Sequence, residues 1–290
     1  TVVLVNPGGG RGRTGARMAQ LRRIAERAGA RLLISRDVAD LERLARQAVA
    51  EGAERLVVAG GDGTIHHSLQ ALAGTETALA ILPLGSGNDL AGALGLPCHL
   101  EAAAEVAFTG QVRAIDLVRA GSRFFGCVAG VGFDSEVNRY ANTIRYLRGG
   151  LVYVWAVLRT LPRFRPVALT IEVDGLEPAV SVRVMFVAFA NSPRYGGGMK
   201  IAPGALLDDG LLDCVIVKEM SRLALLRVFP GVFQGAHLRH PAVSVVRARS
   251  VRVALDRLLT SFGDGEPLIE IGAEPVLFTV VPRALRVVAP

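Results

Sequence analysis

The chain has 290 residues, which is long enough for two domains with a sizeable core. Hydrophobic residues make up 51% of it and charged residues 20%, a balance that excludes an intrinsically disordered chain. The net charge of +7 fits an anionic membrane surface or a nucleotide substrate as well as a nucleic acid. No RNP, zinc-finger or helix-turn-helix pattern accompanies this charge, so we expect no nucleic-acid partner.

Cysteine usage and hydropathy indicate a cytoplasmic protein. Cys98, Cys127 and Cys214 lie far apart without metal-ligand spacing, which is typical of reduced thiols. The apolar run at residues 1–5 is too short for a signal peptide and follows no basic region. No run of about 20 apolar residues occurs, so we expect no membrane-spanning helix.

The N-terminal part of the chain alternates short apolar runs with apolar residues at helical spacing. Alternation of this kind predicts an α/β domain over residues 1–115, with a parallel sheet covered on both faces. Ligands of such sheets bind beyond the carboxyl ends of the strands. The predicted strands are residues 2–5, 31–35, 56–59 and 78–83, and the predicted helices are residues 16–28, 38–51, 65–73 and 100–109.

Glycine-rich loops follow three of these strands, at residues 6–13, 60–63 and 85–88. Because glycine has no Cβ, main-chain N–H groups in such loops can face an anion. The helix that follows residue 64 would bring its positive end to the same place. An ordinary glycine turn explains a single loop equally well, but three loops at one sheet edge predict a phosphate site.

Polar side chains accompany these glycines. Asp62 follows a buried strand, and Asn88 and Asp89 bring a polar pair to the same sheet edge. A carboxylate beside a phosphate favours a bridging divalent cation, while the alternative for Asp89 is a helix N-cap. The adjacent His66 and His67 point different ways in a helix, so we interpret both as structural or nucleotide-adjacent.

The C-terminal part changes to strand-like runs joined by turns, which predicts an antiparallel β-sandwich over residues 116–283. Residues 284–290 form a last strand. Edge strands of a sandwich can pair between copies, which leaves a homodimer open. The predicted strands are residues 124–128, 167–173, 181–190, 212–217, 243–248, 251–255, 268–271 and 276–281.

Two acidic turns interrupt this part. Asp208 and Asp209 fit a polar turn between strands. Asp264 and Glu266 flank a glycine in a predicted hairpin turn, and their like charges favour a cation.

An apolar helix is predicted within residues 146–166 and is too short to span a bilayer. It fits a membrane interface, with Tyr153 and Trp155 at headgroup depth and arginines on anionic lipid. It fits a core helix equally well, and residues 223–233 leave the same two interpretations. The flanking arginines are Arg145, Arg148, Arg159, Arg163 and Arg165.

The motifs together resemble a known family. The order N-P-x-x-G at residues 6–10, G-G-D-G-T at 60–64 and P-x-G-[ST]-x-N-D at 83–89 is similar to the catalytic domain of diacylglycerol kinases, which are related to sphingosine kinases and NAD kinases. NAD kinases carry an Asn-Glu pair and a threonine- and glycine-rich run, which this chain lacks. Segments that resemble the second domain of the family are residues 129–134, 196–203, 208–213 and 264–266.

This resemblance implies a nucleotide-binding α/β domain and an all-β sandwich for the lipid substrate, with the active site in the cleft between them. It implies that the last strand, residues 284–290, returns to the first domain. The residues that the resemblance assigns to ATP are Asn6, Pro7, Gly8, Gly9, Gly10, Ser35, Gly61, Asp62, Gly63, Thr64, Ile65, His66, His67, Ser86 and Asn88.

The resemblance also implies a structural magnesium ion in the second domain. Its ligands would be the carboxylate of Asp209 and the backbone carbonyl groups of Leu206 and Leu211. Magnesium bound by few protein ligands keeps waters, which could link this turn to the active site.

For catalysis, we predict that Asp62 and Glu266, with Asp89, order a second Mg2+ and its waters. Asp264 is the candidate base that accepts the proton of the acceptor hydroxyl, and Asp62 is the alternative.

The predicted function is ATP-dependent transfer of the γ-phosphoryl group to a lipid hydroxyl, with diacylglycerol, which gives phosphatidic acid, as the first candidate. A monoacylglycerol, a polyprenol or a sphingoid base would differ only in pocket shape. The alternatives are a NAD kinase-like or other small-molecule kinase and a non-catalytic nucleotide-binding regulator. As a lipid kinase, the protein would be cytoplasmic and peripherally associated with an anionic membrane surface.

Overall fold

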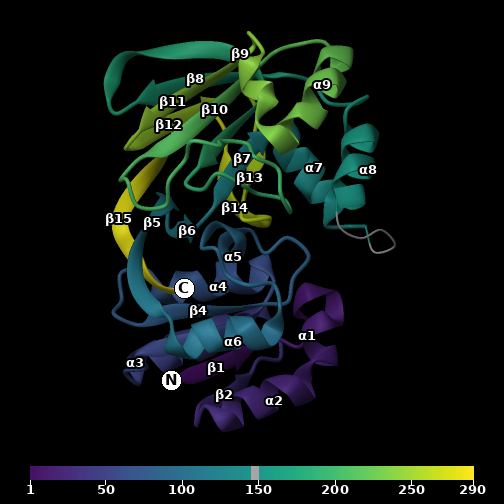
Figure 1. The fold of residues 1–290 in the computed structure, drawn as a ribbon. Coiled ribbons are helices and arrows are strands. Elements are labelled where there is room, and N and C mark those ends of the chain that lie inside the picture. Colours follow the sequence, from purple (N-terminus) through teal and green to yellow (C-terminus); the bar gives the residue numbers. More distant parts are fainter. Residues whose placement is uncertain (145–149) are drawn as a thin grey trace. The chain divides into compact units, whose positions relative to one another are not determined.

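The computed structural model describes residues 1–144 and 150–290 (Figure 1). The chain forms two compact units, which we call unit 1 (Thr1–Leu117 with Pro282–Pro290) and unit 2 (Val118–Val281). Two long strands, β5 (Gln111–Ala120) and β15 (Val276–Ala289), contribute residues to both units. No helix of the described residues is long and apolar enough to cross a membrane.

Unit 1 is built on a parallel sheet in the order β4-β3-β1-β2, as predicted for its fold class. The end of β15 pairs with β4 through Val287 and Leu79. The elements of unit 1 in chain order are β1 (Val2–Val5), the 3-10 helix η1 (Gly9–Gly12), α1 (Arg13–Ala16), α2 (Met18–Arg27), β2 (Arg31–Ile34), α3 (Val38–Ala50), β3 (Arg55–Gly60), α4 (Asp62–Leu72), β4 (Ala78–Pro83), α5 (Asp89–Ala93) and α6 (Leu100–Thr109).

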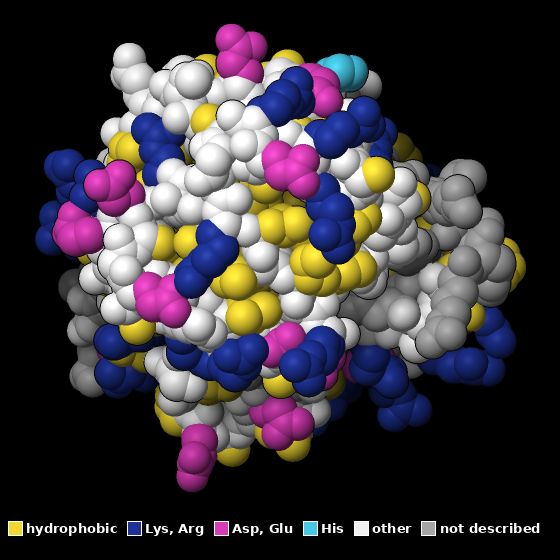
Figure 2. Space-filling model, turned by 90° about the horizontal axis from the view of Figure 1, so that it is seen from below, with side chains coloured by type: hydrophobic (Ala, Val, Ile, Leu, Met, Phe, Trp, Pro, Cys, Tyr) yellow, Lys and Arg dark blue, Asp and Glu magenta, His cyan; other side chains and the backbone are white. Residues whose placement is uncertain are grey.

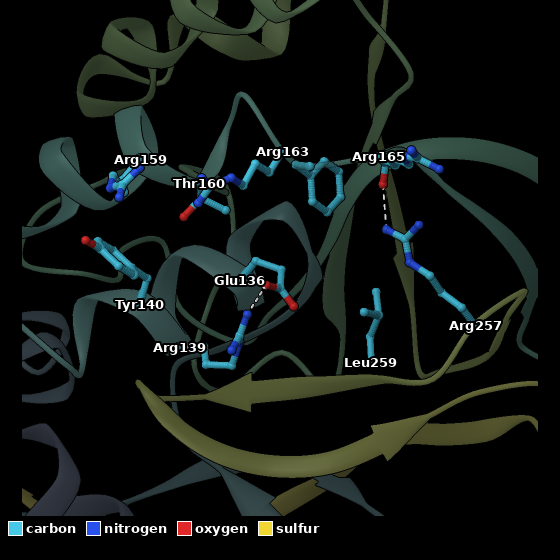
Figure 3. Close-up of a pocket in the computed structure, with 10 residues that line it drawn as sticks. Glu136, Arg139, Tyr140, Arg159, Thr160, Arg163, Arg165, Arg257 and Leu259 are labelled. Carbon is cyan, nitrogen blue, oxygen red and sulfur yellow. Dashed lines mark hydrogen bonds and ion pairs between the residues drawn. The ribbon is translucent and has the colours of Figure 1, made fainter.

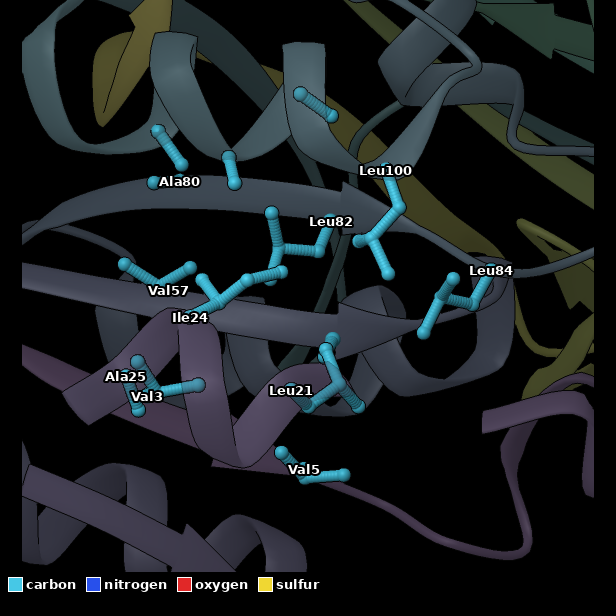
Figure 4. Packing of buried hydrophobic residues seen from close by; sticks show 14 of the residues in the cluster. Val3, Val5, Leu21, Ile24, Ala25, Val57, Ala80, Leu82, Leu84 and Leu100 are labelled. Atoms are coloured by element: carbon cyan, nitrogen blue, oxygen red, sulfur yellow. The ribbon is translucent and has the colours of Figure 1, made fainter. Parts of the chain in front are cut away.

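The core of unit 1 explains why β1 and β4 are uniformly apolar. Every residue of β1 and β4 is buried, because helices cover the sheet. Leu21 and Ile24 of α2 and Leu100 of α6 pack with strand residues in one buried cluster (Figure 4). Each side chain of this size stabilises the fold by about 1.5–3 kcal/mol when fully buried.

Unit 2 is an antiparallel β-sandwich, which confirms the predicted fold class. Its strands follow the order β14-β13-β7-β9-β8-β12-β15, and β10 pairs with β9 and β11. The elements of unit 2 are β6 (Arg123–Phe125), β7 (Val128–Gly132), α7 (Phe133–Ala141), α8 (Gly150–Thr160), β8 (Val167–Val173), β9 (Leu176–Ala190), β10 (Leu212–Lys218), α9 (Arg222–Val228), the 3-10 helices η2 (Phe229–Gln234) and η3 (Ala236–Arg239), β11 (Val243–Ala248), β12 (Ser250–Leu255), β13 (Leu259–Gly263) and β14 (Glu266–Ile271).

Several predicted bounds were wrong. The helix predicted over residues 16–28 is α2, which begins at Met18, and the short helix α1 before it was not predicted. The helix predicted from residue 65 begins at Asp62. The strand predicted over residues 124–128 is split between β6 and β7, and β13 was not predicted. Arg145 and Arg148, which we predicted to flank the apolar helix, lie outside the described residues.

Helix α3 provides a test of local stability in unit 1. Its N-cap residue Asp37 has extended backbone angles, and its carboxylate accepts a hydrogen bond from the Asp40 N–H at 2.8 Å. We expect Asp37→Ala to lower the free energy of unfolding by about 1 kcal/mol, because an N–H of the first turn loses its acceptor. Urea denaturation measures this loss. Asp37→Asn is the control, because asparagine caps as well as aspartate, and an equal loss in both variants would contradict the capping role.

Candidate functional site

The three glycine-rich loops of unit 1 leave the same edge of the parallel sheet. Val5 of β1 pairs with Ala59 of β3, and Gly60 pairs with Pro83 of β4, so the carboxyl ends of the three strands are level. The loops that begin at Asn6, Gly61 and Leu84 therefore start side by side. The structure brings together the loops on which the predicted phosphate site depends.

The carboxylate of Asp62 joins two of these loops. Its Oδ1 accepts a hydrogen bond from the Asp89 N–H at 2.6 Å, and its Oδ2 accepts one from the Asn88 N–H at 2.9 Å. Asn88 is the N-cap of α5 in the left-handed region, with φ 53°, and its side chain closes its own loop onto Gly85. The N-cap role suggested for Asp89 is wrong, because Asp89 is the first residue of the helix and its N–H is satisfied by Asp62.

The glycines of these loops permit close approach of the two backbones. A Cβ on Gly85 would lie 2.6 Å from the Gly61 Cα, and a Cβ on Gly87 would lie 2.6 Å from Asp62 Oδ2. The Oδ2 of Asp89 is 3.5 Å from the same point, so the Asp62 and Asp89 carboxylates both lie beside Gly87. Two carboxylates beside glycine backbone fit a divalent cation near a phosphate.

The first loop also contacts the G-G-D-G-T segment. Asn6 Oδ1 accepts the Gly8 N–H at 3.1 Å, and a Cβ on Gly9 would lie 2.9 Å from the Thr64 hydroxyl. The hydroxyl of Thr14 lies 3.4 Å from the same point, is fully buried and has no hydrogen-bond partner among the described atoms. Sequence reasoning missed Thr14, because no motif marks it and its burial arises from tertiary packing.

Other residues assigned to ATP by resemblance lie at or behind this edge. Ser35 is buried, and its hydroxyl donates to the Val5 carbonyl at 3.3 Å, so it has a structural contact. His66 is fully buried in α4, and His67 Nδ1 lies 2.9 Å from Glu42 Oε1 of α3. The contact between His67 and Glu42 joins α4 to α3. A role for Ser35, His66 and His67 in nucleotide binding stays a prediction.

In unit 2, Asp264 occupies the turn between β13 and β14 with φ 52°. Its Oδ2 accepts the Gly126 N–H at 2.9 Å, and its Oδ1 accepts the Cys127 N–H at 2.8 Å and the Val128 N–H at 3.3 Å. The Asp264 carboxylate is therefore fixed in orientation by the backbone that enters β7. Glu266 begins β14 two residues later.

Asp134 is a buried carboxylate of unit 2. It follows β7 in the first turn of α7 and accepts hydrogen bonds from the Tyr195 hydroxyl at 2.8 Å and from Asn138 Nδ2 at 3.2 Å. Burial raises the pKa of Asp134 to about 6, and the two hydrogen bonds oppose that rise. The sequence showed it only as the end of a glycine-rich segment, and residues 129–132 of that segment are strand β7.

In the turn predicted to hold a structural magnesium ion, the carboxylate of Asp209 has two partners. Asp209 Oδ1 accepts the Leu211 N–H at 3.0 Å, and Asp209 Oδ2 forms an ion pair with Arg247. Arg247 also forms an ion pair with Asp213. Burial raises the pKa of Asp213, and the charge of Arg247 opposes part of that rise. Within the described residues, no group of three or more His, Cys, Asp or Glu side chains could hold a metal ion.

This turn fits magnesium in part. One carboxylate with backbone carbonyl groups and waters is a ligand set that magnesium uses. A cation at Asp209 Oδ2 would compete with Arg247 for the same oxygen, so Oδ1 and the carbonyl groups of Leu206 and Leu211 are the better candidates.

The basic side chains do not form one continuous surface on the face drawn in Figure 2. Lysine and arginine side chains are interspersed there with carboxylates around an apolar area. Several arginines of unit 1 form ion pairs with carboxylates: Arg27 with Glu101, Arg43 with Asp40, and Arg46 with Glu42.

The fold and the loops define a class of two-domain kinases, and comparisons with known proteins agree. Residues 1–120 match the family described as "Diacylglycerol kinase catalytic domain". Residues 127–289 match the family described as "YegS C-terminal NAD kinase beta sandwich-like domain".

Individual relatives cover most of the chain. A protein of Mycobacterium tuberculosis named "Diacylglycerol kinase" is 39% identical over 264 residues, which are 89% of this chain and 84% of that protein. A protein of Pseudomonas fluorescens named "Probable lipid kinase YegS-like" is 34% identical over 268 residues, 88% and 83% of the two chains. A crystal structure of a diacylglycerol kinase of Bacillus anthracis has the same fold, with a TM-score of 0.75, 19% identity and coverage of 100% and 96%.

The chain therefore belongs to the family of diacylglycerol kinases and YegS-like lipid kinases, and it is a kinase. The resemblance read from its glycine-rich and acidic motifs is confirmed.

The buried carboxyl of Asp134 gives a pH-dependent prediction. Its pKa is about 6 in the folded chain and near 4 when unfolded, so the native state binds more protons between these values. The free energy of unfolding should fall as the pH rises from about 4 to about 6, by up to roughly 3 kcal/mol. Urea denaturation across this range should show a flatter profile for Asp134→Asn.

Tyr195→Phe is the matched variant for this experiment. It removes a hydrogen bond that favours the charged carboxylate, so the decline in stability should extend to higher pH. Parallel profiles for the wild type and Asp134→Asn would contradict the assignment.

Proposed function

We propose that this kinase transfers the γ-phosphoryl group of ATP to the hydroxyl group of a membrane lipid, with diacylglycerol as the first candidate. The observation that carries the proposal is the Asp62 carboxylate, which joins the G-G-D-G-T loop to the loop of Asn88 and Asp89. Phosphoryl transfer requires positioned phosphates and neutralised charge, and a cradle of glycine backbone with two carboxylates suits both.

The relatives support a lipid as the acceptor. Proteins named diacylglycerol kinase occur in M. tuberculosis and Bacillus subtilis, at 39% and 29% identity to this chain. Others at similar identity are named only as YegS-like lipid kinases, so we propose the lipid class first and diacylglycerol within it.

The proposal gives the residues of the motifs the following roles. In unit 1, Asn6 to Gly10, Gly61 to Thr64 and Ser86 would bind the nucleotide, and Asp62 and Asp89 would hold a magnesium ion. A role for Glu266 as a magnesium ligand stays a prediction. When bound, the magnesium ion would neutralise charge on the phosphates. Asp264 is the proposed base that accepts the proton of the lipid hydroxyl. Three backbone N–H groups hold its carboxylate in one orientation.

A membrane location and self-association complete the proposal. The lipid substrate would be reached at an anionic membrane surface by a peripherally bound protein. Pairing of edge strands between two copies stays a prediction, which size-exclusion chromatography with light scattering tests.

The direct test is transfer of labelled γ-phosphate from ATP with Mg2+ to diacylglycerol, monoacylglycerol, a polyprenol and a sphingoid base in uncharged mixed micelles, with NAD as a parallel acceptor. We expect labelled phosphatidic acid. Label only in another lipid would change the acceptor and keep the reaction. Transfer to NAD alone would favour a small-molecule kinase, and ATP binding without any transfer would favour a regulator.

A pair of aspartates separates catalytic from structural roles in unit 2. Asp174 and Asp264 both precede glycine in a hairpin turn with positive φ, and both accept backbone N–H groups; Asp174 Oδ1 bonds Arg249 and Ser250 at 2.8 and 2.7 Å. We expect Asp264→Asn to lower stability by about 1–3 kcal/mol, because both oxygens of this carboxylate accept backbone N–H groups and an amide NH2 would meet one of them. Asp174→Asn should cost less, because the backbone N–H groups donate to Oδ1 of Asp174 and an amide oxygen can replace it.

Only Asp264→Asn should abolish phosphate transfer, measured at a temperature where both variants are folded. Activity of Asp264→Asn that matches Asp174→Asn would contradict a catalytic role for Asp264. Asp62→Asn is measured beside these two variants. An inactive Asp62→Asn together with an active Asp264→Asn would assign the role of base to Asp62.

A further inference from the structure

Unit 2 contains a pocket of about 420 Å³ that the kinase chemistry above does not use. It lies against α7, α8, the segment that follows α8 and the connection from β12 to β13 (Figure 3). Five of its lining residues are arginines: Arg139, Arg159, Arg163, Arg165 and Arg257.

The pocket contains far more positive than negative charge. Glu136 is the one carboxylate of its lining, and it already bonds Arg139 at 2.5 Å. Arg159, Arg163 and Arg165 have no ion pair with a carboxylate in the described part of the chain, and the sequence of residues 145–149 contains no acidic residue. An anion from outside the chain would relieve the repulsion among these guanidinium groups.

Part of the pocket is fixed in advance of binding. Arg257 Nη2 donates to the Arg165 carbonyl at 2.6 Å, and its guanidinium lies 5.7 Å from the centre of the Phe164 ring. The guanidinium fork of arginine suits phosphate oxygens, with which it forms two parallel hydrogen bonds. The lining therefore favours a phosphate group.

An exposed apolar stripe lies directly beside these arginines on α8. Val154, Trp155 and Leu158 are 40%, 43% and 50% exposed. Leu158 follows Val154 by four positions and Trp155 by three, so the three side chains are neighbours on the helix surface. Arg159 follows Trp155 by four positions and is its neighbour in the same way. Tryptophan favours the border between headgroups and acyl chains. Free phosphate or a nucleotide would need no such stripe, whereas a phospholipid would contact both features.

We propose that this pocket binds the phosphate group of an anionic phospholipid, while Trp155 and Leu158 enter the border of the acyl region. The pocket would thus dock unit 2 on the membrane that holds the substrate. The inference deepens the proposed function, on which it rests for the presence of a lipid surface.

The experiment is co-sedimentation with vesicles of phosphatidylcholine alone or with 30% phosphatidylglycerol, without ATP. Arg159→Gln/Arg163→Gln should bind the anionic vesicles about thirtyfold more weakly than the wild type, since each basic residue near such a surface contributes about fivefold. Arg22→Gln/Arg23→Gln on α2 removes the same charge from exposed positions of unit 1 and should bind like the wild type. Equal weakening of both variants would overturn the proposal.

A second readout tests the stripe without any arginine variant. Trp155 is the single tryptophan of the chain, so tryptophan emission reports on α8 alone. The emission should shift to shorter wavelength with the anionic vesicles and stay unchanged with phosphatidylcholine or with inorganic phosphate. A wild type that binds inorganic phosphate, with no shift on anionic vesicles, would overturn the lipid as occupant.

The outcomes separate this inference from the proposed function. Vesicle binding that depends on Arg159 and Arg163, with no lipid phosphorylated in micelles, would contradict the proposed reaction and support the docking role of the pocket. Lipid phosphorylation in micelles, with vesicle binding that is unchanged in Arg159→Gln/Arg163→Gln, would support the proposed reaction and contradict the docking role of the pocket.

Discussion

The arrangement of unit 1 depends on one short carboxylate. Asp62 accepts two backbone N–H groups from the loop that leads into α5, and hydrogen bonds to a charged group contribute about 1.5–3 kcal/mol each. Because the aspartate side chain is short, the two backbones must approach closely. That approach excludes a Cβ at Gly85 and at Gly87, so the glycines and the carboxylate form one structural requirement.

Unit 2 uses the same interaction at two turns. Asp174 and Asp264 each precede a glycine at a positive φ, and each carboxylate ties its hairpin to the backbone of a neighbouring strand. One of these turns carries the D-G-E motif of the family, and the other carries no recognisable motif. An Asp-Gly turn with a bonded carboxylate is therefore a structural device that catalysis can adopt, and function has to be argued from the neighbouring Glu266 and from the family.

The fold class was predictable because burial determines it at the level of short segments. Uniformly apolar runs of four to six residues identify β1, β3 and β4 as strands buried on both faces, and glycine loops identify their carboxyl ends. The start of α4 was misplaced because glycine propensity argues against a helix at Gly63, whereas tertiary contacts override it. The glycines of β7 misled in the same way: a Cβ on Gly130 would lie 2.2 Å from Asp134 Oδ2, so packing selects glycine inside a strand.

The candidate site was predictable in its residue types and not in its bonds. The hydrogen bonds of Asp62 and Asp264 join residues that are 26 and 138 positions apart in the sequence, and no local pattern encodes them. The same holds for the pKa of Asp134, since its burial arises from packing between α7 and the strands. Ionisation and orientation of a carboxylate are tertiary properties, so a sequence can indicate which acid is present and not what surrounds it.

The positive charge of the chain acquires a meaning only through its location. Many arginines form exposed ion pairs, such as Arg43 with Asp40 and Arg183 with Glu219, and pairs of that kind contribute little to stability. The arginines of the α8 pocket differ, because five of them share one carboxylate. Natural selection for stability alone would pair or remove such charges, since their repulsion destabilises the fold. Their concentration beside Trp155 and Leu158 is therefore better explained by a ligand that is anionic at one end and apolar at the other.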